Sequence, residues 1–397
     1  MEHERCNLTL SERMTTLRRV LAGLIVTLLA SAASAATIAE EIAAVEKIRG
    51  LRFTAAVKTV EIDRKDLPAH LRRQFAKSLP YSVEEWGDVL RALRLIDQRE
   101  TDEAIVSSLL DLYQSQVLAY YDPPSKTFYT IRQLPDVLQS IPMSGVLDAG
   151  VNVHELTHAL QDQHFHIGER DLALRDDADA NLAYHALIEG EATLVMLAYM
   201  IEQNGGSFDE MISSDLLVGA LSAAATQTLP GGGPRYFTEM LKFPYLDGLQ
   251  FVIEAYRRGG WKELDKVYAN PPQSTREILH PTDYFDHRFT PASFNDKPSI
   301  AVLHLLSVEH LGEWHWRFLA GNADGWKADR VTIGQNRFCE STVLAETQWD
   351  TAAQAQRFYD AYIHTLDEVG YLARIDGTNV RVAFGSDRSL MERFIAP

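Results

Sequence analysis

Hydrophobic side chains recur every three to four positions along much of this chain, the spacing of helices that bury one face. The pattern predicts helices over residues 38–48, 68–78, 83–96, 102–116, 146–163, 178–203, 208–226, 298–319, 351–366 and 390–395. Strand-forming residues gather instead at 53–62, 117–121, 127–131 and 380–384. The segments 117–121 and 127–131 flank Asp122-Pro123-Pro124-Ser125-Lys126, so we expect a β-hairpin with its prolines in the turn.

The order of these elements predicts an α+β fold that is predominantly helical, with a small β-hairpin or sheet before the helix at 146–163. Beyond Pro281, short strand-like runs alternate with helices. We therefore expect a main domain over residues 36–285 and a C-terminal helix with a small α+β region over residues 286–397. The run Pro230-Gly231-Gly232-Gly233-Pro234 is the strongest loop signal in the chain and predicts a linker.

The first 35 residues have the features of a secretory signal peptide. Arg18 and Arg19 precede an apolar run over residues 20–30, and Ala33-Ser34-Ala35 supplies an A-x-A cleavage site. The run is shorter than the roughly 20 apolar residues that span a bilayer. We therefore expect removal of residues 1–35 and a periplasmic or secreted mature protein without stable membrane insertion. The export route and the oligomeric state stay open.

Composition narrows the possible partners. The 397 residues include 38 Lys and Arg against 55 Asp and Glu, which gives a net charge of −17. Because no run of basic residues offsets this acidity, nucleic acid and anionic membrane surfaces are not expected partners. Two cysteines, Cys6 and Cys339, are too few for a disulfide framework or a cysteine-based zinc site.

The segment His154-Glu155-Leu156-Thr157-His158 carries the strongest chemical signal in the chain. Residues four apart lie about 40° apart around a helix, so His154 and His158 leave the same face with Cβ atoms about 5–6 Å apart. Two imidazoles at that separation can close on one zinc ion. Glu155 projects about 100° away, where it can reach a metal-bound water. The H-E-x-x-H spacing therefore predicts two zinc ligands and a general base.

A catalytic zinc site takes a third protein ligand, and the sequence offers more than one. His164 has the spacing of H-E-x-x-H-x-x-G-x-x-H, but Gln161 stands where that pattern has glycine, so the helix can continue and turn His164 away. The next helix carries Glu189 and Glu191. Glu189 shares a polar stripe with Asn181, His185 and Thr193, whereas Glu191 lies on an apolar stripe. Glu189 is therefore the expected third ligand, with Glu191 and His164 as alternatives.

These residues resemble the gluzincin zinc metallopeptidases. Glu189-Gly190-Glu191-Ala192 is similar to the E-G-x-A stretch in which gluzincins such as the aminopeptidases supply their third ligand through the first Glu. The string from His154 to Phe165 resembles an uncharacterised group of secreted or membrane-attached prokaryotic H-E-x-x-H proteins. That resemblance extends in patches over most of residues 117–360, at Tyr120-Tyr121-Asp122-Pro123, Ser274-Thr275-Arg276-Glu277-Ile278-Leu279-His280-Pro281, Gly325-Trp326 with Asp329-Arg330, and Trp349-Asp350-Thr351.

The resemblance implies a zincin-like metallopeptidase domain over residues 36–285 that holds one Zn²⁺ and hydrolyses a peptide or protein substrate. Glu155 would take a proton from water and pass it to the leaving amine. A further donor is needed for the oxyanion, and His280, Tyr284 and Arg276 are the candidates. The strand at 127–131 can offer an edge for an extended substrate.

One departure from the gluzincin pattern concerns the residue that orients the first histidine. Many gluzincins place an Asp four residues after the third ligand, and this chain has Thr193 there. The resemblance then requires another carboxylate, such as Asp177 or Asp179, or a differently tuned histidine. His185 fits either a contact with the zinc ligands or a place in the core.

Two rival interpretations stay open, a non-catalytic exported zinc protein that docks a partner and a metzincin-like peptidase that uses His164. The spacings of His304, His310 and His315, near Glu309, do not share a helical face. These three are therefore interpreted as core or surface histidines, and not as a second metal site.

Overall fold

The computed structural model describes residues 37–78, 82–114, 117–132, 145–215, 219, 234–292, 294, 304–336, 338, 340–366 and 370–396. The expected signal peptide, both cysteines and the glycine run 231–233 lie outside these residues.

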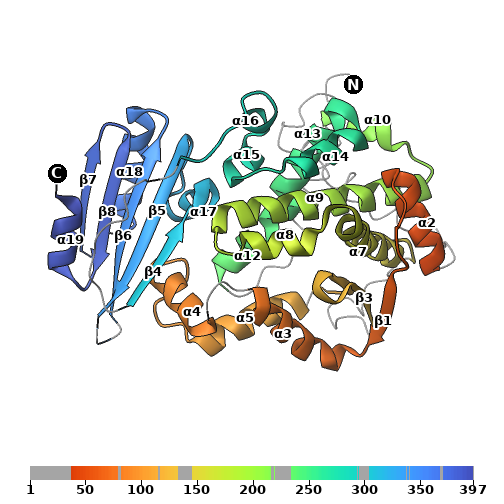
Figure 1. Ribbon diagram of the computed structural model, residues 1–397, viewed down its shortest axis with the longest axis horizontal. Coiled ribbons are helices and arrows are strands. Elements are labelled where there is room, and N and C mark those ends of the chain that lie inside the picture. Colours follow the sequence, from red (N-terminus) through yellow and green to blue (C-terminus); the bar gives the residue numbers. More distant parts are fainter. Residues whose placement is uncertain are drawn as a thin grey trace, which may run out of the picture.

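The structure is α+β and mostly helical, as the sequence predicts (Figure 1). The helices are α2 (Ile38–Arg49), α3 (Leu67–Ser78), α4 (Val83–Ala92), α5 (Asp102–Gln114), α7 (Gly145–Phe165), α8 (Ile167–Leu174), α9 (Ala178–Gln203), α10 (Phe208–Ile212), α12 (Arg235–Phe243), α13 (Leu249–Gly259), α14 (Trp261–Ala269), α15 (Thr275–Leu279), α16 (Pro281–Phe285), α17 (Gly312–Ala320), α18 (Ala352–His364) and α19 (Arg388–Ile395). A π-helical turn, η3 (Pro244–Gly248), joins α12 to α13.

Capping residues define both ends of α2. At the start of α2, the Thr37 side chain accepts from the backbone of Glu40, and the Glu40 side chain accepts in return from Thr37. The same helix ends at Gly50, whose left-handed φ of 71° suits a glycine. These caps fix the position of Arg49, the last residue of α2, which packs against α7 and α9.

The first sheet contains β1 (Lys58–Ile62), β2 (Ala119–Asp122) and β3 (Thr127–Ile131), in the order β1-β3-β2. β2 and β3 form the expected antiparallel hairpin, while β1 pairs with β3 in parallel. The strand at 127–131 is therefore central, and the expectation that it offers a docking edge was wrong. β1 occupies one edge, and β2 occupies the edge that packs against α7.

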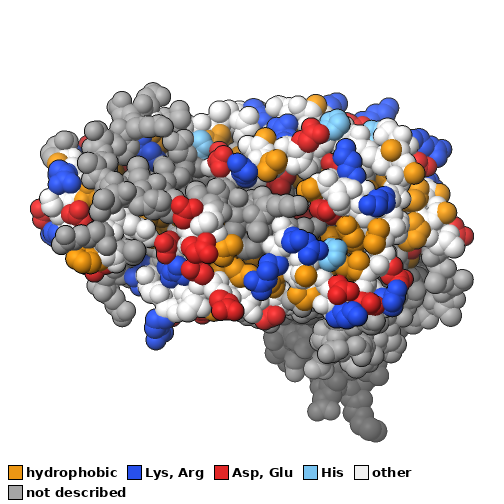
Figure 2. All heavy atoms as spheres, turned by 60° about the horizontal axis from the view of Figure 1, so that its bottom comes forward, with side chains coloured by type: hydrophobic (Ala, Val, Ile, Leu, Met, Phe, Trp, Pro, Cys, Tyr) orange, Lys and Arg blue, Asp and Glu red, His pale blue; other side chains and the backbone are white. Residues whose placement is uncertain are grey.

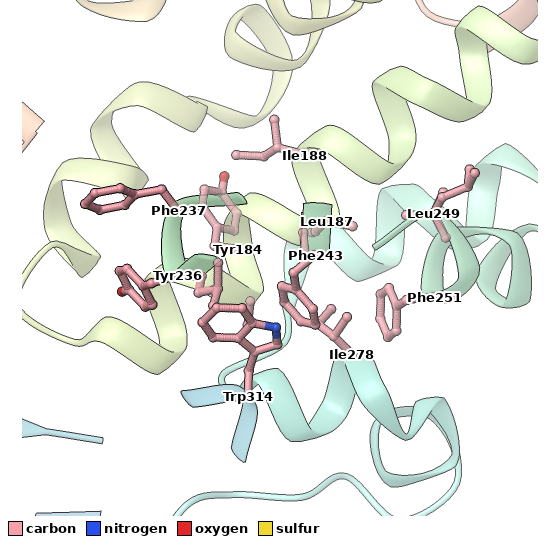
Figure 3. Packing of buried hydrophobic residues seen from close by; sticks show 14 of the residues in the cluster. Tyr184, Leu187, Ile188, Tyr236, Phe237, Phe243, Leu249, Phe251, Ile278 and Trp314 are labelled. Carbon is pink, nitrogen blue, oxygen red and sulfur yellow. The ribbon is translucent and has the colours of Figure 1, made fainter. Parts of the chain in front are cut away.

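The long helices α7 and α9 form the centre of the helical part, where they pack against each other (Figure 1). α2 covers both of them, and α13 and η3 pack on α9. Tyr184 and Leu187 of α9 lie in one core with Phe243 of α12, Phe251 of α13 and Trp314 of α17 (Figure 3). Because side chains from so many elements fix these two helices, the polar residues that they carry are held in defined positions.

The second sheet contains β4 (His304–Glu309), β5 (Trp326–Gln335), β6 (Ser341–Trp349), β7 (Tyr371–Asp376) and β8 (Asn379–Gly385). Its order is β4-β5-β6-β8-β7, and every pair is antiparallel. Alternate residues of β6 face opposite sides, so Val343 lies in the main core and Leu344 packs with Leu390 and Met391 of α19. This sheet lies at one end of the molecule (Figure 1).

The predicted helix at 298–319 is wrong in its first part. Residues 304–309 form β4, and the helix begins only at Gly312. The helix predicted over 83–96 ends at Ala92, and α10 ends at Ile212, so residues 213–215 of the helix predicted over 208–226 are not in that helix. The rest of that helix lies mostly outside the described residues.

Among the described residues, no helix combines the length and the apolar character that crossing a membrane requires. On the face shown in Figure 2, basic side chains are interspersed with acidic and hydrophobic ones.

Candidate metal centre

His154 and His158 project from one face of α7 toward each other. Both side chains are buried, and their ring planes meet at 86° with centroids 4.7 Å apart. The two Nε2 atoms lie 3.1 Å apart. The i, i+4 spacing therefore has the effect that the sequence predicts.

Glu189 of α9 completes the cluster. Its Oε2 lies 3.1 Å from Nε2 of His154 and 3.5 Å from Nε2 of His158. Two donors bound to a tetrahedral zinc ion at about 2.0–2.1 Å lie about 3.3–3.4 Å from each other. The three atoms are thus spaced as one ion requires, and this group of residues can hold a metal.

Glu155 lies beside the cluster, half-buried, and is held by the edge of the first sheet. The backbone N–H of Tyr121 in β2 donates to Oε2 of Glu155 at 2.8 Å. Burial raises the pKa of the Glu155 carboxyl, although both histidines oppose the shift. The carboxylate is therefore fixed in place and has become a better proton acceptor than an exposed glutamate.

Charges within the cluster attract one another strongly. Burial alone would lower the pKa of His158, but the Glu189 carboxylate outweighs it and raises this pKa to about 9. Burial would likewise raise the pKa of Glu189, yet His158 and His154 hold it well below its ordinary value. Without a metal ion, a proton on His158 thus balances the negative charge of Glu189.

Gln161, one turn after His158, adjoins the cluster, a contact that the sequence pattern does not predict. Its Oε1 lies 2.8 Å from Nδ1 of His158, and its Nε2 donates to Glu191 at 2.7 Å and to the carbonyl of Ile188 at 3.1 Å. Glu191 faces away from the cluster and pairs with Arg49. The stripe that carries Glu191 is buried, as predicted, but it holds an ion pair.

His164 lies apart from the cluster. α7 continues to Phe165, and the ring of His164 contacts the backbone carbonyl of Arg52 through Nε2 at 2.8 Å. With Gln161 in place of glycine the helix does not break, so nothing brings this histidine toward Glu189.

His185 lies on the face of α9 that carries Glu189, four residues earlier. Its Nε2 donates to Asp171 of α8 at 2.6 Å, and Asn181 donates to the same carboxylate oxygen. Burial would lower the pKa of His185, but Asp171 raises it. The ring is half-exposed, and the charges of Glu189 and His158 also act on it.

Tyr245 reaches the cluster from η3. Its ring is stacked on that of His154, with centroids 6.0 Å apart and planes at 22°. η3 comes this close because Gly190 and Gly248 have no side chains. A β-carbon on Gly190 would overlap the carbonyl of Gly248, and one on Gly248 would overlap the carbonyl of Ala186. The sequence pattern gave no sign of Tyr245.

The carboxylates considered as partners for His154 are engaged elsewhere. Asp177 pairs with His310 at 3.0 Å, and Asp179 accepts hydrogen bonds from Thr275. Thr193 is buried, and its hydroxyl has no hydrogen-bond partner among the described residues. The structure therefore gives no support to a role for Asp177 or Asp179 in orienting His154.

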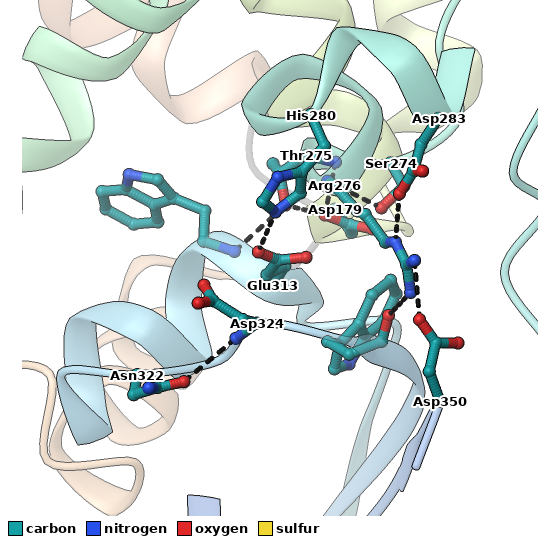
Figure 4. A network of polar contacts seen from close by, with 12 residues as sticks. Asp179, Ser274, Thr275, Arg276, His280, Asp283, Glu313, Asn322, Asp324 and Asp350 are labelled. Atoms are coloured by element: carbon teal, nitrogen blue, oxygen red, sulfur yellow. Dashed lines mark hydrogen bonds and ion pairs between the residues drawn. The ribbon is translucent and has the colours of Figure 1, made fainter. Parts of the chain in front are cut away.

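His280, Arg276 and Tyr284 form contacts away from the cluster of His154, His158 and Glu189. Arg276 pairs with Asp283 and Asp350, and Nε2 of His280 lies 2.7 Å from Oε1 of Glu313 (Figure 4). Tyr284 donates to the carbonyl of Asn270. This network meets α9 at Asp179, ten residues or about 15 Å along the helix from Glu189. The three residues are thus not brought to the cluster as oxyanion donors.

His280, Glu313 and Asp324 form a second acidic and histidine group. The 2.7 Å separation of His280 and Glu313 is that of a direct hydrogen bond and is shorter than two ligands of one ion require. His310 pairs with Asp177, and His315 lies in the core with its Nε2 3.2 Å from the hydroxyl of Tyr236. For His304 the structure describes only the backbone, as part of β4.

Comparison with known proteins gives one match. Residues 306–391 match the family described as Domain of unknown function (DUF8575). No curated protein and no solved structure matches the chain at the level of significance applied. The matched segment is a minor part of the chain, in the region of the second sheet, and does not include the cluster.

Proposed function

We propose that this protein is an exported zinc-dependent metallohydrolase, with a zincin-like domain, that hydrolyses peptide bonds. The observation that carries the proposal is the convergence of His154, His158 and Glu189, with Glu155 held beside them. The gluzincin resemblance at the same residues supports it. A small α+β region over residues 286–397 accompanies the domain.

The donor set favours zinc in a catalytic form. Two imidazoles and one carboxylate are ligands that zinc takes in hydrolases, and three protein ligands leave a fourth position open. A purely structural site is closed by four ligands. When bound there, the ion would lower the pKa of water and polarise a carbonyl oxygen.

Glu155 is the proposed general base. It takes a proton from the attacking water and then delivers it to the amine that leaves. The N–H of Tyr121 keeps one carboxylate oxygen fixed during both transfers, so the other oxygen is free to move the proton.

We propose two residues as stabilisers of the oxyanion. His185 lies one turn from Glu189 on the same face, with its charge supported by Asp171. Tyr245 lies against His154 and carries a phenolic donor. These residues replace His280 and Tyr284 in the proposed mechanism, because their positions adjoin the cluster.

The proposal is tested by metal content and turnover together. The mature protein should bind one zinc ion per chain and cleave members of a quenched peptide library. A chelator should abolish cleavage, and added zinc should restore it. Zinc binding without cleavage of any peptide would favour a non-catalytic zinc protein that docks a partner, whereas absence of bound zinc would refute the proposal.

A further inference from the structure

Arg49 and Glu191 form an ion pair in the interior beneath the metal centre. Their side chains are 1% and 0% exposed. Arg49 also binds Asp265 at 2.7 Å and lies over the rings of Phe165 and Trp261. Replacement of a buried ion pair by apolar residues of similar volume is often neutral or stabilising. Stability alone is therefore a weak reason for charges at this place.

The pair is connected to a metal ligand through one amide. Glu191, paired with Arg49, accepts hydrogen bonds, as the carbonyl of Ile188 does, so the NH₂ of Gln161 must face them. The amide oxygen then faces Nδ1 of His158. Because an oxygen only accepts, Nδ1 must carry a proton, and Nε2 is the nitrogen left for a metal.

We infer that Arg49 and Glu191 are positioning residues, which act through Gln161 to fix the Nδ1–H form of His158 and present its Nε2 to the metal. The inference rests on the proposed metal site and adds the ion pair that orients one of its proposed ligands. Arg49 belongs to α2, which the sequence signal gave no reason to connect with the site.

The arrangement also explains why an amide and not a carboxylate contacts Nδ1 of His158. Glu155 and Glu189 already place two carboxylates at the centre. A carboxylate at Nδ1 of His158 would add a third negative charge. The amide of Gln161 instead orients the His158 ring and separates it from the charge of Glu191, which Arg49 balances.

The first test replaces the whole pair in the mature protein, as Arg49→Met with Glu191→Met. Zinc affinity, measured by competition with a chelator, should fall about 10- to 100-fold, as for other residues that orient metal ligands. The melting temperature should stay near that of the wild type. Arg330→Met with Glu346→Met removes another largely buried pair, in the second sheet, and should leave zinc affinity unchanged. A well-folded Arg49/Glu191 variant with wild-type affinity would overturn the inference.

A second pair of variants keeps the inference testable if that protein does not fold. Gln161→Met removes the acceptor of His158 and should weaken zinc binding to a similar degree. Gln161→Glu with Glu191→Gln exchanges amide and carboxylate and keeps an acceptor for Nδ1 of His158, but the carbonyl of Ile188 loses its donor. This variant should therefore bind zinc more tightly than Gln161→Met and less tightly than the wild type. Equal affinities for Gln161→Met and the wild type would contradict the inference.

The tautomer can also be read without metal. In Glu189→Ala, which removes the competing carboxylate, ¹⁵N NMR of labelled histidine in alkaline solution should show the Nδ1–H form of His158. Addition of Gln161→Met should remove this preference. An Nε2–H form in the Glu189→Ala protein would overturn the inference whether or not the wild type binds zinc. Absence of zinc with the Nδ1–H form present would refute only the proposed function.

Discussion

The carbonyl of Gly248 lies so close to Gly190 that a β-carbon on Gly190 would overlap it. Gly190 follows Glu189 directly, and Gly248 ends the π-helical turn that carries Tyr245. This backbone contact between α9 and η3 therefore sets the distance between Glu189 and Tyr245, whose ring is stacked on that of His154. The glycine of the E-G-x-A stretch has a local reason here, the close approach of a second backbone.

Gly190→Ala should force η3 away from α9. Overpacking of this kind costs about 1–3 kcal/mol, so the free energy of unfolding should fall by that amount in chemical denaturation. Turnover should fall as well, since Tyr245 moves. Gly219→Ala is the control, because no described atom would contact a β-carbon on Gly219 and no loss is expected there. Equal stability of the two variants would contradict the close contact between Gly190 and the carbonyl of Gly248.

Glu189, and not His164, should determine metal binding. Glu189→Ala removes the oxygen 3.1 Å from His154 and should lower the zinc content to a small fraction of one ion per chain. His164→Ala removes only a contact with the carbonyl of Arg52 and should retain full zinc content. Loss of zinc in His164→Ala with retention in Glu189→Ala would support the metzincin-like alternative.

His185 and Tyr245 should contribute to the rate while leaving zinc bound. His185→Gln and Tyr245→Phe each remove a donor proposed for the oxyanion, and such losses reduce kcat by about 10²- to 10³-fold. Steady-state kinetics on one cleaved peptide would measure this, with zinc content checked in parallel. Tyr284→Phe is the control, because its hydroxyl binds the carbonyl of Asn270. A loss in Tyr284→Phe equal to the others would contradict the assignment.

Asp179 should make stability depend on pH. Burial raises its pKa from 3.8 to about 7, and hydrogen bonds from Ser274 and Thr275 only partly oppose this. Between these values the unfolded chain releases a proton that the folded protein keeps, so the free energy of unfolding should fall as pH rises and level off above about 7.

Asp179→Asn keeps an oxygen for Thr275 and cannot ionise. The part of the fall in the free energy of unfolding that comes from Asp179 should therefore disappear. Glu277, whose pKa burial also raises to about 7, keeps its own contribution. Denaturation curves across the range would measure the difference. An identical pH dependence in Asp179→Asn and the wild type would contradict the assignment.

The sequence predicted α7 and α9, and it predicted that His154 and His158 share one face of α7, because local periodicity determines which side chains lie on the same side of a helix. It also singled out Glu189, which meets them from α9. It could not predict Gln161 or Arg49 as parts of the site. Arg49 and Glu191 are 142 residues apart, and only the packing of α2 against α7 and α9 brings them together.

Other errors have similar physical causes. The apolar segment that contains β4 reads as helix because a short apolar run does not distinguish a buried strand from a buried helix. The central position of β3 results from parallel pairing with β1, far away in sequence. The sequence also could not predict that His280 contacts Glu313 and that Tyr284 donates to the carbonyl of Asn270, because both partners come from other elements.

The most direct test of the central claim compares the wild type with Glu155→Gln, each loaded with one zinc ion, on the same quenched peptides. The amide can keep the hydrogen bond from Tyr121 and leaves the three ligands intact, but it cannot accept the proton. The account predicts equal zinc content and a rate at least about 10²-fold lower in Glu155→Gln. Cleavage at the wild-type rate by Glu155→Gln would contradict it.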